Sequence, residues 1–88
     1  MSWVWVLETE AKRELHRLDF AAQKRIVRYL DTRVLGGDPR RFGKPLRGDR
    51  HGLWCWRVDD HRIIAQIRDQ ELRILIVRVA HRSTVYDD

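Results

Sequence analysis

Three strand-like segments follow one another in the second half of the chain, and this pattern constrains the fold more than any other feature. The segments 53–58, 62–68 and 72–80 are rich in β-branched and aromatic residues, and short polar breaks separate them. We expect Asp59-Asp60 and Asp69-Gln70 to be two-residue loops, which join antiparallel strands as tight hairpins. The sequence therefore predicts an antiparallel meander.

The alternation of side chains along these strands predicts two different faces. With two-residue loops, Arg57 lies opposite Arg62, and Arg62 lies opposite Val77. One face is then apolar throughout, and we expect it to carry the helices, whereas the other is mixed and has a basic stripe. The apolar face collects Trp54, Trp56, Val58, Ile63, Ala65, Ile67, Leu72, Ile74 and Ile76, and the mixed face collects Cys55, Arg57, Arg62, Ile64, Gln66, Arg68, Arg73, Leu75, Val77 and Val79.

The first half of the chain predicts one strand and two helices. Residues 3–7 are apolar on both alternating sides, which indicates a buried strand. Thr9 and Asp19 are good caps for two amphipathic helices, and Gly36-Gly37 ends the second one. The predicted fold is α+β in the order β-α-α-β-β-β, with a two-helix hairpin on one face of a small, largely antiparallel sheet.

Length and composition limit the class of protein. The 88 residues suffice for one small domain, predicted to span residues 1–88. No apolar run approaches the ~20 residues of a membrane helix, and no secretory signal is visible, so we expect a cytoplasmic protein without a membrane partner. Cys55 is the single cysteine, which excludes an internal disulfide.

Positive charge is concentrated in the second half of the chain. The net charge is +5, and 15 of the 18 basic residues are Arg. Residues 39–86 alone carry 11 basic and 5 acidic side chains. An arginine bias with solvated side chains explains part of this excess, but a polyanion such as nucleic acid is the sharper interpretation. Within residues 40–52, which we expect to form a loop, the cations are Arg40, Arg41, Lys44, Arg47 and Arg50.

The expected pairing of Arg57 with Arg62 is the first candidate site. Two cations about 5 Å apart repel by about 1 kcal/mol in water and about 3 kcal/mol at an effective dielectric constant of 20. An anion between them would convert the repulsion into a fork on a phosphate. The alternative is that the two side chains splay into solvent or pair with Asp59 and Asp60.

The end of the last predicted strand is the second candidate site. His81 has an ordinary pKa of about 6.5 and suits acid or base catalysis. Tyr86, with a pKa of about 10, would need a cationic neighbour such as Arg82 to accept a proton. The alternative is that Tyr86 covers the sheet edge and His81 is a surface imidazole.

Few classes of reaction fit the sequence, because it has no phosphate-binding loop, no dinucleotide fingerprint and no His/Cys/acid cluster with metal-ligand spacing. We therefore expect no metal and no cofactor. RNA cleavage fits, since the substrate supplies its own nucleophile, the 2′-hydroxyl, and requires only positioning, proton transfer and charge stabilisation.

Three motifs in order resemble the RelE/ParE superfamily of bacterial toxins from type II toxin–antitoxin systems. They are the segment 44–48 (KPLRG), the segment 52–64 (GLWCWRVDDHRII), and the segment 79–82 (VAHR) followed by Val85-Tyr86. With the β-α-α-β-β-β layout, they cover nearly the whole chain.

The RelE branch resembles a metal-free, ribosome-dependent mRNA endonuclease (mRNA interferase) that cleaves messages in the decoding site of the 30S subunit. The resemblance implies that Arg57 and Arg62 bind the scissile phosphate, that Arg82 stabilises charge or protonates the leaving group, and that Tyr86 is the general base. It also implies a RelB-like antitoxin as partner. We further expect RNA contacts from Lys44, Arg47, Arg50 and His81.

Two alternatives stay open at this point. ParE-like members share the fold but poison DNA gyrase and are not nucleases. A degenerate toxin that only binds RNA or antitoxin is the other alternative, since Cys55 stands where the family usually has Arg or Lys. Asp59 and His61 also replace the usual Gly and Tyr of the hairpin, and the sequence given ends two residues after Tyr86.

Overall fold

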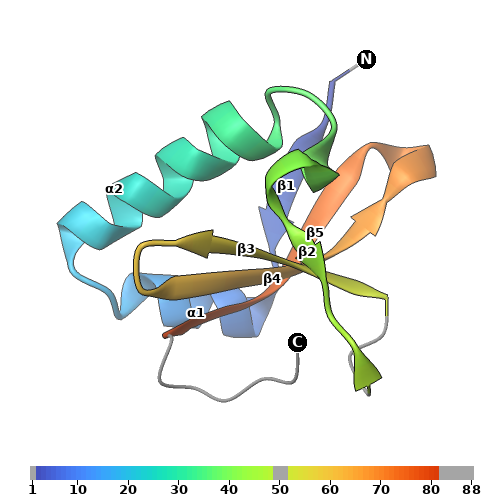
Figure 1. Ribbon diagram of the computed structural model, residues 1–88. Coiled ribbons are helices and arrows are strands. Elements are labelled where there is room, and N and C mark those ends of the chain that lie inside the picture. The colour runs from blue at the N-terminus through green and yellow to red at the C-terminus, as the bar shows by residue number, and fades with distance from the viewer. Residues whose placement is uncertain (1, 49–51, 82–88) are drawn as a thin grey trace.

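Two helices lie on one side of a twisted five-stranded sheet in the computed structural model (Figure 1). The structure describes residues 2–48 and 52–81. The strand order is β1-β5-β4-β3-β2, with β1 parallel to β5 and the other neighbours antiparallel. The elements are β1 (Val4–Leu7), α1 (Thr9–His16), α2 (Phe20–Tyr29), a π-helical turn η1 (Leu30–Val34), a 3₁₀ turn η2 (Pro39–Phe42), β2 (Lys44–Pro45), β3 (Leu53–Val58), β4 (His61–Arg68), a 3₁₀ turn η4 (Asp69–Glu71) and β5 (Arg73–His81).

The predicted α+β class is confirmed, and the helices differ from the prediction at the cap of α1 and at the end of α2, where the π-helical turn η1 follows Tyr29. The Asp19 side chain accepts a hydrogen bond from the Ala22 N–H at 2.7 Å, which is the expected N-cap of α2. At α1 the cap position is Glu8, without a side-chain cap bond, and Thr9 is the first helical residue. The predicted cap by Thr9 is therefore wrong by one residue. None of the described helices is long and apolar enough to cross a membrane.

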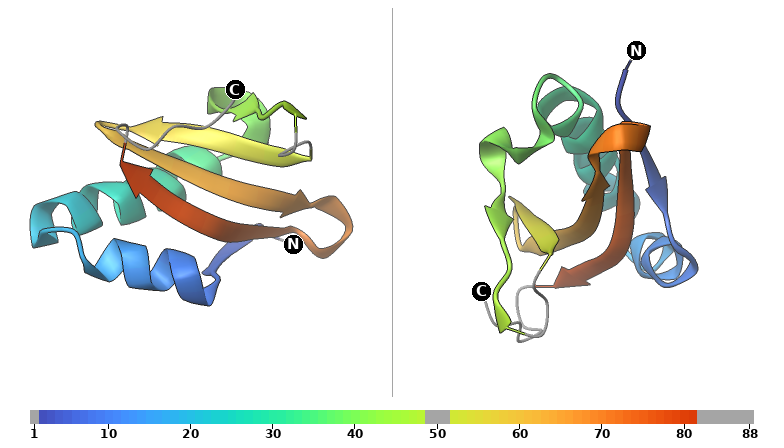
Figure 2. Two further views of the ribbon diagram at one scale, coloured as in Figure 1. Left: turned by 90° about the horizontal axis from the view of Figure 1, so that it is seen from below. Right: turned by 90° about the vertical axis from the view of Figure 1, so that its right-hand side faces the viewer.

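The main core lies between the helices and one face of the sheet. α1 packs on β5 and α2 packs against β3, as the two views in Figure 2 show. Trp56 is fully buried at the centre, and its indole N–H donates to the Pro39 carbonyl at 2.9 Å. The buried members of this core, here called the helix-side core, are Ala11, Leu15, Ile26, Leu30, Val34, Trp56, Val58, Ile63, Ala65, Ile74, Ile76 and Val79.

The opposite side of the sheet, here called the open face, carries a second and smaller core. Its buried members are Leu46, Cys55, Ile64 and Ala80. Leu46 comes from the segment after β2 and packs over the sheet. The predicted loop over residues 40–52 is thus wrong in part, because it contains η2 and β2, and β2 adds a fifth strand beside β3.

The hairpin between β3 and β4 has the predicted register, but the hairpin between β4 and β5 does not. Arg57 lies opposite Arg62, as expected. Arg62, however, lies opposite Ala80 and not opposite Val77. The β4–β5 connection spans four residues, since Arg68 pairs with Arg73, and a bulge next to Ile64 shifts the register again. The shift also moves Val79 into the helix-side core, whereas the sequence placed it on the mixed face.

The first strand is half-buried and not buried on both sides as predicted. β1 is an edge strand, and only one of its faces meets the helices. Trp5 and Leu7 pack against the helix-side core, while Val4 and Val6 are 48% and 38% exposed. Apolar side chains on both faces of residues 3–7 therefore do not identify a central strand here.

Candidate RNA-binding and catalytic site

Three cations from three neighbouring strands share the open face. Arg57 and Arg62 are direct cross-strand partners on β3 and β4. Lys44 on β2 lies opposite Cys55, so that it faces the same side as Cys55 and Arg57. These residues, here called the cation triad, are Lys44, Arg57 and Arg62.

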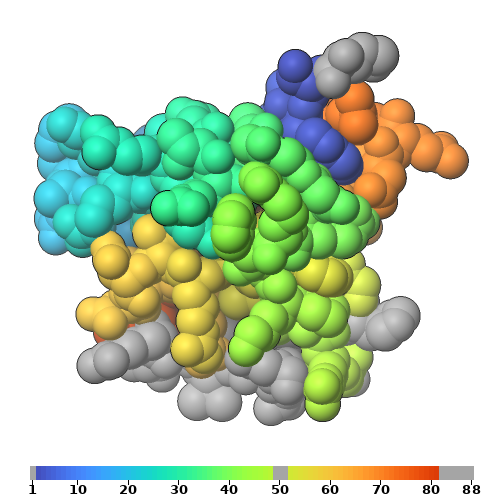
Figure 3. Space-filling model, turned by 45° about the horizontal axis from the view of Figure 1, so that its top comes forward, coloured from blue at the N-terminus to red at the C-terminus, as the bar shows by residue number. Residues whose placement is uncertain are grey.

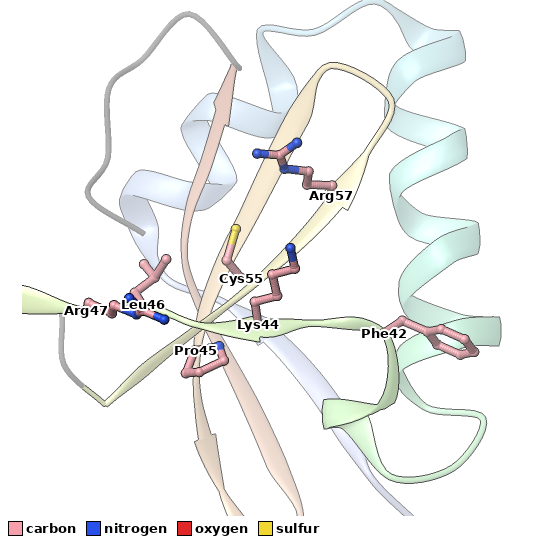
Figure 4. A pocket seen from close by; sticks show the side chains of 7 residues that line it. All are labelled: Phe42, Lys44, Pro45, Leu46, Arg47, Cys55 and Arg57. Carbon is pink, nitrogen blue, oxygen red and sulfur yellow. The ribbon is translucent and has the colours of Figure 1, made fainter.

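A hollow of about 460 Å³ lies beside the triad. Its lining comes from the segment around β2 and from β3, and Lys44, Cys55 and Arg57 lie between its two ends, Phe42 and Arg47 (Figure 4). The small open-face core forms part of its floor, since Leu46 and Cys55 belong to both. The full lining is Phe42, Lys44, Pro45, Leu46, Arg47, Cys55 and Arg57.

The backbone of the β3–β4 hairpin fixes the two arginines at the tip of the sheet. Asp59 takes a left-handed conformation (φ 55°) in the two-residue turn, which aspartate tolerates better than most residues. The Asp59 carboxylate also accepts a hydrogen bond from Arg25 Nε on α2, which ties the turn to the helix layer. Arg57 and Arg62 are thereby held on a rigid hairpin and not on a loose loop.

The end of β5 is fixed by a partly buried ion pair between Arg78 and Glu14 of α1. Glu14 accepts hydrogen bonds from Arg78 (Nε at 3.0 Å, Nη2 at 2.7 Å) and from the Val79 backbone N–H at 2.8 Å. Burial opposes ionisation of Glu14, but the bonds from Arg78 and Val79 outweigh it and lower the pKa of the carboxyl. This contact holds the strand that leads into the segment with Arg82 and Tyr86.

The histidine predicted to contact RNA lies apart from the triad. His81 is the cross-strand partner of His61, and the two rings meet edge to face with their centroids 5.6 Å apart. His61 in turn lies opposite Val58, a member of the helix-side core. His81 therefore faces the helix side, whereas the triad faces the open side.

The remaining predicted site residues divide into two groups. Arg47 is exposed and lines the hollow together with Lys44 and Arg57. Arg50, Arg82 and Tyr86 lie outside the residues that the structure describes. In the described part of the chain, no three His, Cys, Asp or Glu side chains gather into a metal-binding group.

Comparison with known proteins identifies the family. Residues 6–86 match the model of the ParE toxin of type II toxin–antitoxin systems. The chain belongs to the RelE/ParE superfamily of type II toxins. Toxin RelG of Mycobacterium tuberculosis is 33% identical over 78 residues, which is 89% of this chain and 88% of the relative. Toxin RelE of the same organism is 37% identical over 76 residues, or 86% and 77% of the two chains.

Solved structures of this superfamily share the fold. A chain of the toxin–antitoxin complex RelBE2 from Mycobacterium tuberculosis superposes with a TM-score of 0.85 at 29% identity, covering 93% of this chain and all of that one. The archaeal RelE–RelB complex from Pyrococcus horikoshii superposes with a TM-score of 0.72 at 20% identity, covering 97% of this chain and all of that one. The second match shows the fold alone.

Sequence reasoning missed two features of this candidate site, the strand β2 and the aromatic Phe42. Lys44 was predicted to contact RNA but was expected in a loop, and the two-residue strand places it directly beside β3. Pro45 argues against a strand in the sequence, because proline is depleted in strands. Proline is tolerated at sheet edges, and β2 is an edge strand. Phe42 at the end of the hollow was not singled out at all, although an aromatic residue within a basic segment was a visible signal.

Proposed function

We propose that this toxin is a ribosome-dependent mRNA endonuclease, and that a RelB-like antitoxin is its inhibitory partner. The observation that carries the proposal is the cation triad, which places Arg57 and Arg62 directly opposite each other with Lys44 on the same face. Two guanidiniums from neighbouring strands on one face can bind the oxygens of one phosphate with charge-assisted hydrogen bonds. The names of the relatives, RelE and RelG, support the same branch.

The reaction needs no group beyond the RNA and side chains. The 2′-oxygen attacks the adjacent phosphorus, the bond from phosphorus to the 5′-oxygen breaks, and a 2′,3′-cyclic phosphate and a 5′-hydroxyl result. One proton leaves the 2′-hydroxyl and another reaches the departing 5′-oxygen. Arg57 and Arg62 neutralise the charge that grows on the phosphate. A well-placed donor of this kind lowers the activation barrier by about 3 to 4 kcal/mol.

The two proton-transfer roles come from the resemblance to the family. Tyr86 takes the proton of the 2′-hydroxyl, and Arg82 stabilises charge or protonates the leaving group. Arg47 and Lys44 hold the neighbouring RNA backbone along the hollow. Arg50 and His81 stay predictions as RNA contacts, with His81 on the other side of the sheet from the triad.

The decisive experiment maps message ends in cells after a brief pulse of expression. Primer extension should show new 5′ ends inside coding regions, in phase with codons, for the unaltered toxin and none for Arg62→Ala or Arg82→Ala. Arg68→Ala is the matched control, because Arg68 lies on the same strand six residues further on, about 20 Å away. Arg68→Ala should cleave like the unaltered toxin.

Poisoning of DNA gyrase is the second candidate, because the matching family model is that of the ParE toxin. Arrest of growth without any new message ends would contradict the nuclease proposal, and inhibition of supercoiling by purified toxin would then support the gyrase target. The salt dependence of RNA binding also distinguishes the nuclease from the gyrase poison, because a gyrase contact does not require RNA. Neutralisation of four phosphates gives single-stranded RNA binding a log–log slope of about −3 against salt.

A further inference from the structure

Phe42 is an exposed aromatic side chain at one end of the hollow that holds Lys44 and Arg57. The residue is 48% exposed, although burial of a phenylalanine normally stabilises a small domain. The residue lies at the end of η2, two positions before Lys44. Figure 4 shows Phe42 at one end of β2 and Arg47 at the other.

Two arginines lie close to this ring. The guanidinium carbons of Arg41 and Arg33 lie 5.0 Å and 5.4 Å from the centroid of the Phe42 ring. Arg41 donates hydrogen bonds to the backbone carbonyls of Arg33 (3.1 Å) and Asp38 (3.3 Å), so its guanidinium is fixed in place by neutral acceptors. We call Phe42, Arg33 and Arg41 the Phe42 platform.

The positions of Gly37 and Gly43 leave room for the platform because glycine has no side chain. A Cβ on Gly37 would lie 2.7 Å from the Arg41 guanidinium carbon, so any side chain there would displace Arg41. A Cβ on Gly43 would lie 2.3 Å from Trp54 Nε1 and 2.8 Å from Trp56 Nε1. The chain just after Phe42 therefore lies directly on core tryptophans, and the platform is pre-organised by the fold. Figure 3 shows this segment, in green, beside the end of the α2 layer.

An aromatic ring beside guanidinium groups, next to a row of cations, is the chemistry that binds single-stranded RNA. Bases stack on aromatic rings and on guanidinium planes, while Lys and Arg hold the phosphates. We propose that the Phe42 platform is a stacking site for one base of the RNA strand whose scissile phosphate lies at the cation triad. This inference rests on the proposed function and adds to it a base-binding residue outside the phosphate site.

The molecule offers a matched control in a second exposed phenylalanine. Phe20 is 73% exposed, and Lys24 Nζ lies 5.4 Å from its ring centroid. It lies at the start of α2 and is not part of the lining of the hollow that contains Lys44 and Arg57. If any exposed aromatic near a cation sufficed, Phe20 and Phe42 would behave alike.

The test uses short RNA that cannot be cleaved. Oligonucleotides with 2′-O-methyl groups throughout and one 2-aminopurine, moved along the strand, report stacking as fluorescence quenching without any turnover. For Phe42→Ala we expect about 5- to 100-fold weaker binding and loss of quenching at the responsive position. Phe42→Trp should keep both, and Phe20→Ala should match the unaltered protein. Arg57→Ala should weaken binding yet keep the quenching at saturating RNA.

Several results would overturn the inference. The first is that Phe42→Ala quenches and binds RNA like the unaltered protein while Arg57→Ala binds weakly. The phosphate site of the proposed function would then stand, and the platform would not. Another is equal loss in Phe20→Ala and Phe42→Ala. A third is the absence of RNA binding by the unaltered protein, or a loss in Phe42→Ala confined to antitoxin binding. Equal denaturation midpoints of the two alanine variants guard against a folding defect, and Phe42→Trp provides a second check. Mapped message cleavage would remain independent evidence for the nuclease in each case.

Discussion

The two faces of the sheet are built on opposite principles. The helix side buries a continuous apolar core around Trp56. Among the described residues, no charged or polar side chain is buried. The open face buries only the four small-core residues and surrounds them with cations. Arg57 and Arg62 are direct cross-strand partners there.

This difference separates stability from function by position in the sheet. Neighbouring residues on one strand, such as Trp56 and Arg57, point to opposite faces and meet different physical demands. A substitution on the helix side should therefore change the free energy of unfolding, and one on the open face should change binding and turnover. Each prediction below tests one side of this division.

The largest effect is expected at Trp56. Trp56→Ala removes a fully buried side chain and leaves the Pro39 carbonyl without its indole donor. We expect a loss of about 3 to 5 kcal/mol in the free energy of unfolding, measured by urea denaturation. Trp56→Phe keeps most of the volume and should lose about 1 to 3 kcal/mol, so a measurement remains if the alanine variant does not fold. Phe20→Ala, at an exposed position, should stay within about 0.5 kcal/mol of the unaltered protein.

Arg57→Ala should have the opposite profile. We expect cleavage of translated messages to fall by about 100- to 1000-fold, because one donor to the developing phosphate charge is lost. The free energy of unfolding should change by no more than about 0.5 kcal/mol, because the Arg57 side chain is exposed. Both quantities are measured on one preparation. A stability loss as large as the activity loss would show that Arg57 supports the fold and would erase the proposed division.

Sequence reasoning succeeded where local chemistry sets the geometry. The Asp59-Asp60 turn fixes the register of β3 and β4, so the facing of Arg57 and Arg62 was predictable. It failed at β5, because the four-residue connection ends on Leu72 in a left-handed conformation (φ 51°), which a leucine rarely adopts. The bulge beside Ile64 has no sequence signal either. These two features shift the partner of Arg62 from Val77 to Ala80.

The candidate site was predictable in composition but less so in arrangement. The cations of the segment around residues 40–47 were visible, but which of them faces the hairpin depends on β2, a strand of two residues set by packing over β3. The position of His81 depends on the same shift in β5, which placed its neighbour Val79 on the helix side. Long-range register, and not residue type, therefore decided which predicted residues meet.

A smaller effect is expected at Glu14, which joins the helix layer to the end of β5. Glu14→Gln keeps the size of the side chain but loses the charge opposite Arg78, and we expect about 1 to 3 kcal/mol less stability at pH 7. Because the folded-state pKa lies below the ordinary 4.5, the contribution is complete above that pH and is lost as the pH falls through the folded value. Denaturation at pH 7 and pH 3 should thus show a smaller acid loss for Glu14→Gln. Glu10→Gln, an exposed acid on the same helix, is the matched control and should leave the acid loss unchanged.

The smallest effect is expected at Cys55, where the two principles meet. Cys55 is 8% exposed, packs in the small open-face core with Leu46, and lines the hollow together with Lys44 and Arg57. Cys55→Ala removes one buried sulfur, so we expect about 1 kcal/mol less stability and unchanged toxicity. Cys55→Arg adds a cation beside Lys44 and Arg57, and its long side chain can extend from the floor to solvent, so toxicity should be equal or higher. Reduced toxicity together with a lower denaturation midpoint in Cys55→Arg would show that the small core, and not charge, dominates at this position, and the open face would then also contribute to stability.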